Sequence, residues 1–156
     1  DVNMITAANI GVGISGLEGQ QAARAADYSI GQFKFLKVLL FVHGRECYRR
    51  NAYLVLYFFY KNLLMVFPIW VYGFSSLYSG DMIYNEWLYQ IYNMAFTAFP
   101  IAYYSVFDWQ KTKPELMSHP DLYEIGLKNT DFSHFVFWES YLVALIQSSL
   151  LTLITF

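Results

Sequence analysis

The run at residues 52–74 limits most strongly what this chain can fold into, because it is long and apolar and carries one charged residue, Lys61. Roughly 20 such residues are enough for a helix to cross a bilayer. Residues 87–107 form a second apolar run with no charged residue, and a third covers residues 137–156. We therefore predict transmembrane helices at 52–74 and 87–107, and the start of a third at 137–156.

The composition agrees with a membrane protein and excludes other classes. Hydrophobic residues make up 56% and charged residues 14% of the 156, against about 45–50% and 25% in soluble domains. A net charge of −2 argues against a nucleic-acid partner, because such proteins carry a basic face. Cys47 is the only cysteine, which excludes a disulfide within the chain and a Cys-based zinc site. Because the sequence begins without Met and ends inside an apolar run, we expect a piece of a longer protein.

The first 33 residues have a different pattern. Apolar residues alternate with Gly and Ser in "NIGVGIS", as in a short strand. Helical "GLEGQQAARAAD" follows, and then a second short strand, "YSI". Alternation of helix and strand over so few residues indicates the edge of an α/β domain. The predicted fold class is therefore mixed: an α/β edge at 1–33, a stalk helix at 34–51, and an α-helical transmembrane segment.

The distribution of Lys and Arg predicts how the spans are oriented. Residues 75–86 contain neither, whereas both 34–51 and 108–136 contain them. Because basic residues stay on the cytosolic side, we predict an exoplasmic loop at 75–86 and a cytosolic loop at 108–136. The chain is thus expected to belong to a multi-pass integral membrane protein.

Lys61 is predicted to lie on the order of 12 Å inside the cytosolic boundary, at 1.5 Å per residue. A cation at mid-membrane costs roughly 2.5–3.5 kcal/mol, so its side chain should face protein or water. Two interpretations remain open. Lys61 ties two helices together by bonding to Tyr hydroxyls or to carbonyls, such as that of Leu64, which Pro68 frees; or it lines a polar path with Asn62 and Asn93. No carboxylate accompanies these residues, which favours an anionic or zwitterionic solute over a metal cation.

Two prolines within the predicted spans can each be explained in two ways. Pro100 could open the second helix locally, which is tolerated only beside protein or water. For Pro68 and Pro100 alike, a simple packing kink is as good an explanation as a role in transport.

The chain also resembles a known family. The segments "GVGISGLEGQQA", "ADYSIGQFKFLKVLLFVHGR", "FYKN" and "YNMAFTAFP" are similar to the end of the phosphorylation domain and the next membrane helices of P-type ATPases. More narrowly, they resemble the type IV branch, the phospholipid flippases. The resemblance is nearly continuous over residues 1–107 and looser afterwards. It implies that the α/β edge is HAD-like.

The resemblance implies roles for single residues. Asp1 matches the last aspartate of the family's T-G-D-G-x-N-D motif, which implies a metal- and cofactor-binding role towards Mg²⁺ and phosphate; taken alone, Asp1 would be a helix N-cap. Lys61 and Asn62 match a lysine–asparagine pair, and Asn93 an asparagine of the next helix. These positions lie along the lipid headgroup path in the flippases.

The implied function is ATP-driven movement of phospholipid from the exoplasmic to the cytosolic leaflet through an aspartyl-phosphate. The chain contains neither the phosphorylated aspartate nor the nucleotide domain, so no catalytic residue is expected within it. ATP and Mg²⁺ would be bound mainly by other parts of the protein, and an accessory β-subunit is an expected partner. A cation-transporting P-type ATPase and a truncated, non-catalytic membrane protein are the alternatives.

Overall fold

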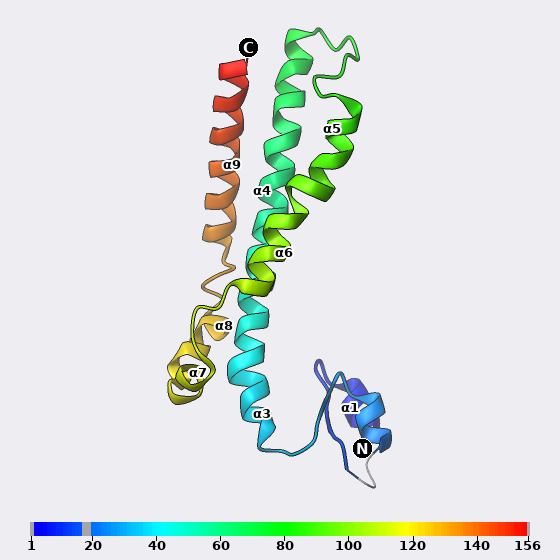
Figure 1. Ribbon diagram of the computed structural model, residues 1–156, viewed down its shortest axis with the longest axis vertical. Coiled ribbons are helices and arrows are strands. Elements are labelled where there is room, and N and C mark those ends of the chain that lie inside the picture. Colours follow the sequence, from blue (N-terminus) through cyan, green and yellow to red (C-terminus); the bar gives the residue numbers. More distant parts are fainter. Residues whose placement is uncertain (1, 17–19, 156) are drawn as a thin grey trace. The chain divides into compact units, whose positions relative to one another are not determined.

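The computed structural model describes residues 2–16 and 20–155, and most of them are helical (Figure 1). In chain order the elements are α1 (Val2–Ala7), β1 (Val12–Ile14), α2 (Gln20–Ala25), β2 (Tyr28–Ile30), α3 (Phe35–Val38), the π-helix η1 (Leu39–Gly44), α4 (Arg45–Ser75), α5 (Glu86–Ile91), the π-helix η2 (Tyr92–Phe96), α6 (Ala98–Phe107), α7 (Lys113–Ser118), the 3₁₀-helix η3 (Pro120–Tyr123), α8 (Glu124–Lys128) and α9 (His134–Thr155). They form two compact units, Asp1–Glu46 with Lys111–Tyr123, and Cys47–Gln110 with Glu124–Phe156.

In the first unit, β1 and β2 pair in parallel, with Val12 opposite Tyr28. Helix α2 lies directly on β1 at Gly13, where an added Cβ would come within 2.8 Å of the Ala22 carbonyl oxygen. Only glycine allows that approach. The strands and the helix expected between residues 9 and 30 are therefore present. The HAD-like α/β domain to which they were assigned stays a prediction.

A second cluster in this unit joins η1 to α7. Val42 and Leu116 are almost completely buried, and a capping box between Thr112 and Glu115 begins α7. Arg45 donates a hydrogen bond to the Leu122 carbonyl at 3.2 Å.

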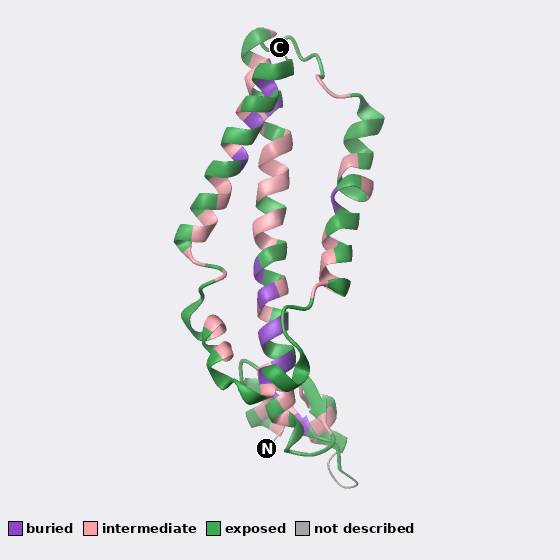
Figure 2. Cartoon of the chain, turned by 60° about the vertical axis from the view of Figure 1, so that its left-hand side comes forward, coloured by how far each residue is buried: buried purple, intermediate pink, exposed green. Residues whose placement is uncertain are grey.

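The second unit is built around α4, with α9 along one side and α5 and α6 along the other (Figures 1 and 2). Three small side chains of α9 are buried one turn apart: Ala144, Ser148 and Thr152. Small residues allow two helix backbones to approach closely, which is how helices associate within a membrane.

Pro68 explains one polar contact between these helices. Proline lacks an N–H, so the carbonyl of Leu64 loses its partner within α4. The hydroxyl of Ser148 donates to that oxygen at 3.4 Å. The freed carbonyl predicted from the sequence therefore exists, and α9 satisfies it.

The second apolar run is interrupted. The Thr97 N–H donates to the Tyr92 carbonyl, five residues back, at 3.1 Å, which gives the π-helical turn η2 before α6 begins. The hydroxyl of Tyr57 on α4 donates to the carbonyl of Thr97 at 3.3 Å. Irregular backbone beside Pro100 is thus satisfied by protein, as the sequence required.

Within the described residues, two helices are long and apolar enough to cross a membrane: Phe35–Ser75, formed by α3, η1 and α4, and His134–Thr155. They overlap the first and third predicted spans, and the first also includes the predicted stalk. Large apolar side chains of these helices are exposed, among them Val66, Leu150 and Leu153. The span at 87–107 consists of three shorter helical segments and stays a prediction.

The contact between α9 and α4 yields a testable expectation. Ser148→Leu should lower the melting temperature of the full-length protein in nanodiscs, because overpacking costs about 1–3 kcal/mol. Ser148→Ala should lower it less, since a hydrogen bond inside a membrane is worth about 0.6 kcal/mol. Ser149→Leu is the matched control, because the Ser149 hydroxyl bonds to the Leu145 carbonyl of its own helix. Equal effects of Ser148→Leu and Ser149→Leu would contradict this packing.

Candidate functional site

Lys61 lies on α4 and extends its ammonium group towards η2. Its Nζ donates to Asn93 Oδ1 and to Thr97 Oγ1, both at 3.1 Å, and lies 5.4 Å from the centre of the Phe58 ring. Hydrogen bonds to a charged group are worth roughly 1.5–3 kcal/mol each. Two of them are of the size needed to offset the cost of placing a lysine at this depth.

The break in the second apolar run holds the acceptors of this cluster in place. Thr97 is buried, and its hydroxyl donates to the Asn93 carbonyl at 3.0 Å, so its oxygen is turned to accept from Lys61. The hydroxyl of Tyr92 donates to the Lys61 carbonyl at 3.3 Å. Hydrogen bonds of Thr97 and Tyr92 therefore hold the second apolar run against α4 at Lys61.

The structure brings together two of the residues predicted for the polar path. Lys61 and Asn93 are in direct contact, whereas no hydrogen bond joins Asn62 to either of them in the part of the chain that is described. Asn62 is the next residue along α4, about 100° around the helix axis. Asp1 lies outside the described residues.

The donors of this cluster outnumber its acceptors. An ammonium group has three N–H donors, and two of those of Lys61 are used. The amide of Asn93 keeps two N–H donors while its oxygen accepts. No carboxylate pairs with Lys61 among the described residues, so the positive charge is not neutralised. Such an arrangement suits the oxygen atoms of an anion better than a metal cation.

No role was predicted for Thr97 from the sequence. The signal was the spacing of Asn93 and Thr97, because residues four apart lie on the same face of a helix. Tyr57 and Tyr92 were missed altogether. One aromatic residue among many gives no signal that its hydroxyl is used.

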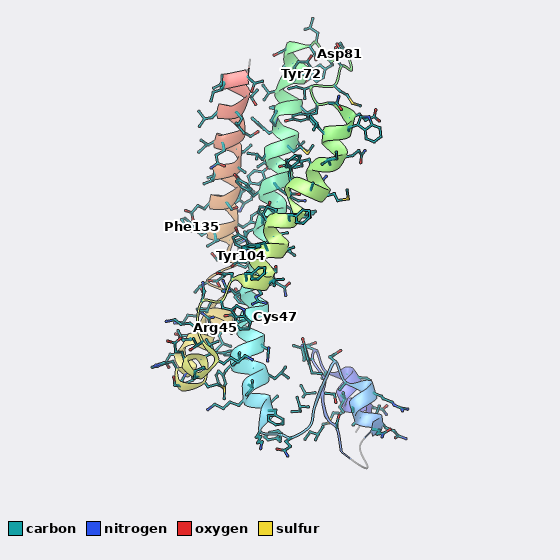
Figure 3. All side chains as sticks on the ribbon, in the orientation of Figure 1. Arg45, Cys47, Tyr72, Asp81, Tyr104 and Phe135 are labelled. Atoms are coloured by element: carbon teal, nitrogen blue, oxygen red, sulfur yellow. The ribbon has the colours of Figure 1, made fainter. Side chains whose placement is uncertain are left out.

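A second polar cluster joins α4 to the end of α6. Arg49 donates to Asp108 Oδ2 at 2.6 Å and to the Tyr104 hydroxyl at 2.8 Å, and Figure 3 marks Tyr104 beside α4. The guanidinium of Arg50 lies 5.1 Å from the ring centre of Trp109. Tyr104 and Trp109 thus contact the basic residues that precede the first apolar run.

The electrostatics of this second cluster follow from its geometry. The hydrogen bond from Arg49 lowers the pKa of Asp108 below its ordinary value of 3.8. The carboxylate is therefore ionised at neutral pH, and the pair stabilises the contact between the two helices.

Among residues 2–16 and 20–155, no three or more His, Cys, Asp or Glu side chains are grouped so that they could hold a metal ion.

The fold and the site together define a helical protein with two candidate membrane helices and an uncompensated cation between α4 and η2. The model of the phospholipid-translocating P-type ATPase C-terminal family matches residues 23–156. The chain belongs to this family.

Curated relatives agree with that assignment. The chain is 46% identical to phospholipid-transporting ATPase DRS2 of Saccharomyces cerevisiae over 138 residues, 88% of the chain and 10% of that protein. It is 40% identical to phospholipid-transporting ATPase VD of Homo sapiens over 148 residues, 95% of the chain and 10% of that protein. It is 41% identical to probable phospholipid-transporting ATPase 12 of Arabidopsis thaliana over 133 residues, 85% of the chain and 11% of that protein. The chain spans about a tenth of the length of these relatives.

The Arg49–Asp108 pair predicts a pH dependence. The lowered pKa means that its stabilisation is complete above pH 3.8 and is lost as the pH falls through the lowered value. Asp108→Asn should therefore reduce the drop in melting temperature of the full-length protein on acidification below that pH. Asp121→Asn, an exposed carboxylate, should leave the drop unchanged. An identical acid profile for Asp108→Asn and the unmodified protein would show that the pair does not stabilise the fold.

Proposed function

We propose that this chain is the C-terminal part of an ATP-driven phospholipid translocase that moves lipid from the exoplasmic to the cytosolic leaflet through an aspartyl-phosphate intermediate. The family match and the names of the relatives, which are phospholipid-transporting ATPases, support this class of protein. The observation that carries the proposal is the Lys61 cluster, because it offers N–H donors and a positive charge without a carboxylate.

We propose the same division into domains, stalk, membrane helices and loops that the sequence predicts. Residues 1–33 end a HAD-like phosphorylation domain, and 34–51 form the stalk. The membrane helices are 52–74, 87–107 and the one that begins at 137. Residues 75–86 form the exoplasmic loop and 108–136 the cytosolic one. The continuous helix Phe35–Ser75 supports a role in coupling the phosphorylation domain to Lys61, because a continuous helix transmits rigid-body motion from one end to the other.

In the proposed mechanism, Lys61, Asn62 and Asn93 line the headgroup path. The phosphate of a passing lipid takes the remaining N–H of Lys61 and the amide N–H groups of Asn93. Thr97 keeps the ammonium group in place when the headgroup leaves, because its oxygen accepts from Lys61 without a headgroup. A bound headgroup thus adds an acceptor for the third N–H of Lys61.

ATP and Mg²⁺ belong to this proposal through the family. Bound Mg²⁺ would neutralise and position phosphate oxygens during phosphoryl transfer, and Asp1 is the residue of this chain assigned to it. The described residues supply no metal-binding cluster, so no step of the mechanism is derived from them. An accessory β-subunit is proposed on the same family basis.

A role in cation transport is less well supported by the geometry. Ca²⁺ and similar ions need several carboxylate or carbonyl oxygens, and the side chains around Lys61 in the described structure are an amide, a hydroxyl and a phenyl ring.

Lys61 provides the direct test. In the full-length protein, Lys61→Ala should weaken the apparent affinity for the stimulating lipid about tenfold, the worth of one charged hydrogen bond, while phosphorylation by ATP stays measurable. Lipid-stimulated ATPase activity and phosphoenzyme formation are the two measurements. Lys128→Ala, which removes an exposed lysine paired with Glu124, is the control. Unchanged lipid stimulation in Lys61→Ala would make Lys61 a structural tie between helices.

The two asparagines provide a matched pair. Asn93→Leu removes an acceptor of Lys61 and should impair lipid-stimulated activity strongly. Asn62→Leu makes the same change one residue from Lys61 and should impair it less, because that side chain lies outside the hydrogen-bonded cluster. The comparison uses the lipid concentration at half-maximal ATPase stimulation. A larger effect at Asn62 would mean that the path follows the other face of α4.

A further inference from the structure

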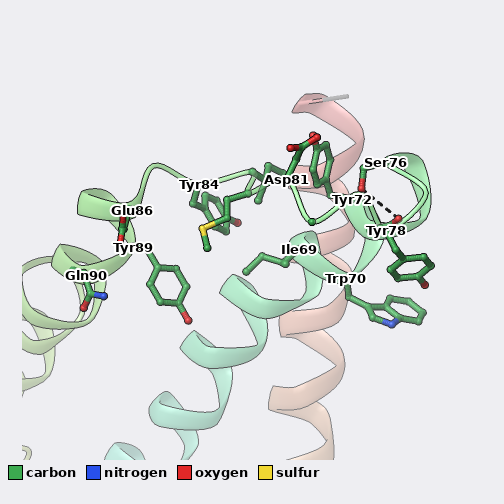
Figure 4. Close-up of a pocket in the computed structure, with 14 residues that line it drawn as sticks. Ile69, Trp70, Tyr72, Ser76, Tyr78, Asp81, Tyr84, Glu86, Tyr89 and Gln90 are labelled. Carbon is green, nitrogen blue, oxygen red and sulfur yellow. Dashed lines mark hydrogen bonds between the residues drawn. The ribbon is translucent and has the colours of Figure 1, made fainter.

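A cavity of 660 Å³ opens in the second unit between the last turns of α4, the segment after it and α5 (Figure 4). Five aromatic side chains line it: Trp70, Tyr72, Tyr78, Tyr84 and Tyr89. The cavity lies at the loop predicted to be exoplasmic, far along the chain from the cytosolic cluster of Arg49.

The end of α4 places one of these rings. Leu77 and Tyr78 have left-handed backbone angles, with φ of 50° and 57°, and the Tyr78 N–H donates to the Gly73 carbonyl at 2.9 Å. Gly73 lets the Tyr78 ring lie against the helix, since a Cβ there would come within 3.1 Å of it.

The charge of this cavity is uncompensated. Asp81 and Glu86 line it, and residues 62–110 contain no Lys or Arg. Asp81 accepts a hydrogen bond from Ser79 at 2.9 Å, and within the described structure no side-chain partner is found for Glu86. Carboxylates beside aromatic faces are the chemistry that recognises an organic ammonium ion. A bare metal ion would find too few oxygens.

A second cavity of 540 Å³ adjoins the first, and both are lined by Ile83, Tyr84 and Tyr89. Its other walls are mainly apolar side chains of α4, α5 and α9, including Leu64, Leu88 and Leu151. An acidic, aromatic cavity beside an apolar one matches the chemistry of an amphiphile with a cationic head.

We propose that the two cavities together bind one zwitterionic phospholipid of the exoplasmic leaflet. Its ammonium group lies among the aromatic rings near Asp81 and Glu86, and an acyl chain occupies the apolar cavity. Lipids with an anionic headgroup and no amine are excluded by the two carboxylates. This inference rests on the proposed function for the orientation of the loop.

The position of this site relates it to the Lys61 cluster. Tyr92 lines the apolar cavity, and its hydroxyl bonds to the Lys61 carbonyl. Tyr92 thus contacts both the apolar cavity and the backbone of Lys61.

The experiment uses photoactivatable phosphatidylcholine, with photoactivatable phosphatidylglycerol of the same chains as the comparison. The full-length protein in nanodiscs is labelled without ATP, and crosslinked peptides are identified by mass spectrometry. Phosphatidylcholine should label the region of residues 69–90 more than phosphatidylglycerol does. Labelling by the two lipids to the same extent would overturn the proposal.

Variants of the two carboxylates and of one aromatic ring test which side chains hold the lipid. Asp81→Asn/Glu86→Gln should reduce phosphatidylcholine labelling about threefold or more, the worth of one ammonium contact, and Tyr84→Leu should do the same while Tyr84→Phe retains it. The matched control is Asp121→Asn/Asp131→Asn, which removes two carboxylates elsewhere. Labelling unchanged in both Asp81→Asn/Glu86→Gln and Tyr84→Leu would overturn the site.

A competitor distinguishes a lipid from a free ammonium solute. Glycerophosphocholine has the headgroup without acyl chains and should compete poorly; equally effective competition would overturn the claim of a lipid occupant. Because labelling needs no ATP, it can persist when lipid-stimulated ATPase activity is absent. Such a result would contradict the proposed function and leave this site standing.

Discussion

The ammonium group of Lys61 is the constraint on which the membrane half of this structure depends. A cation inside an apolar helix needs oxygen acceptors, and those of Lys61 in the described structure come from outside α4. Asn93 and Thr97 supply them, and they reach Lys61 where the neighbouring run changes from π-helix to α-helix. The irregular backbone is itself stabilised from α4, by the hydroxyl of Tyr57. The Lys61 cluster and the irregular backbone thus support one another.

Packing on the other side of α4 follows a different rule. There α9 buries the small side chains of Ala144, Ser148 and Thr152, and the hydroxyl of Ser148 satisfies a carbonyl that Pro68 frees on α4. Small residues hold the backbones close, whereas larger apolar side chains of both helices stay exposed. Helix α4 therefore has a tightly packed side towards α9 and a polar side towards η2. This asymmetry leaves room for the apolar cavity between α4, α5 and α9.

Much of this could be predicted from the sequence. The strands near residues 12 and 28, the long helices, the freed carbonyl of Leu64 and the nearness of Lys61 to Asn93 follow from local patterns and from the cost of an unpaired charge. The role of Thr97 and of two tyrosine hydroxyls could not be predicted, because it depends on the rotation of one helix against another. Asn62 was grouped with Lys61 by adjacency, yet neighbours on a helix point in different directions. The cavity lined by Asp81 and Glu86 depends on how the chain turns after α4, which no local pattern specifies.

We expect Lys61 and Asn93 to contact the lipid headgroup directly. A structure of the full-length protein with phospholipid bound tests it most directly. A phosphate oxygen should lie within about 3 Å of Lys61 Nζ, a normal hydrogen-bond distance, with the Asn93 amide as a second donor. A headgroup bound elsewhere, with Lys61 still bonded only to Asn93 and Thr97, would contradict it.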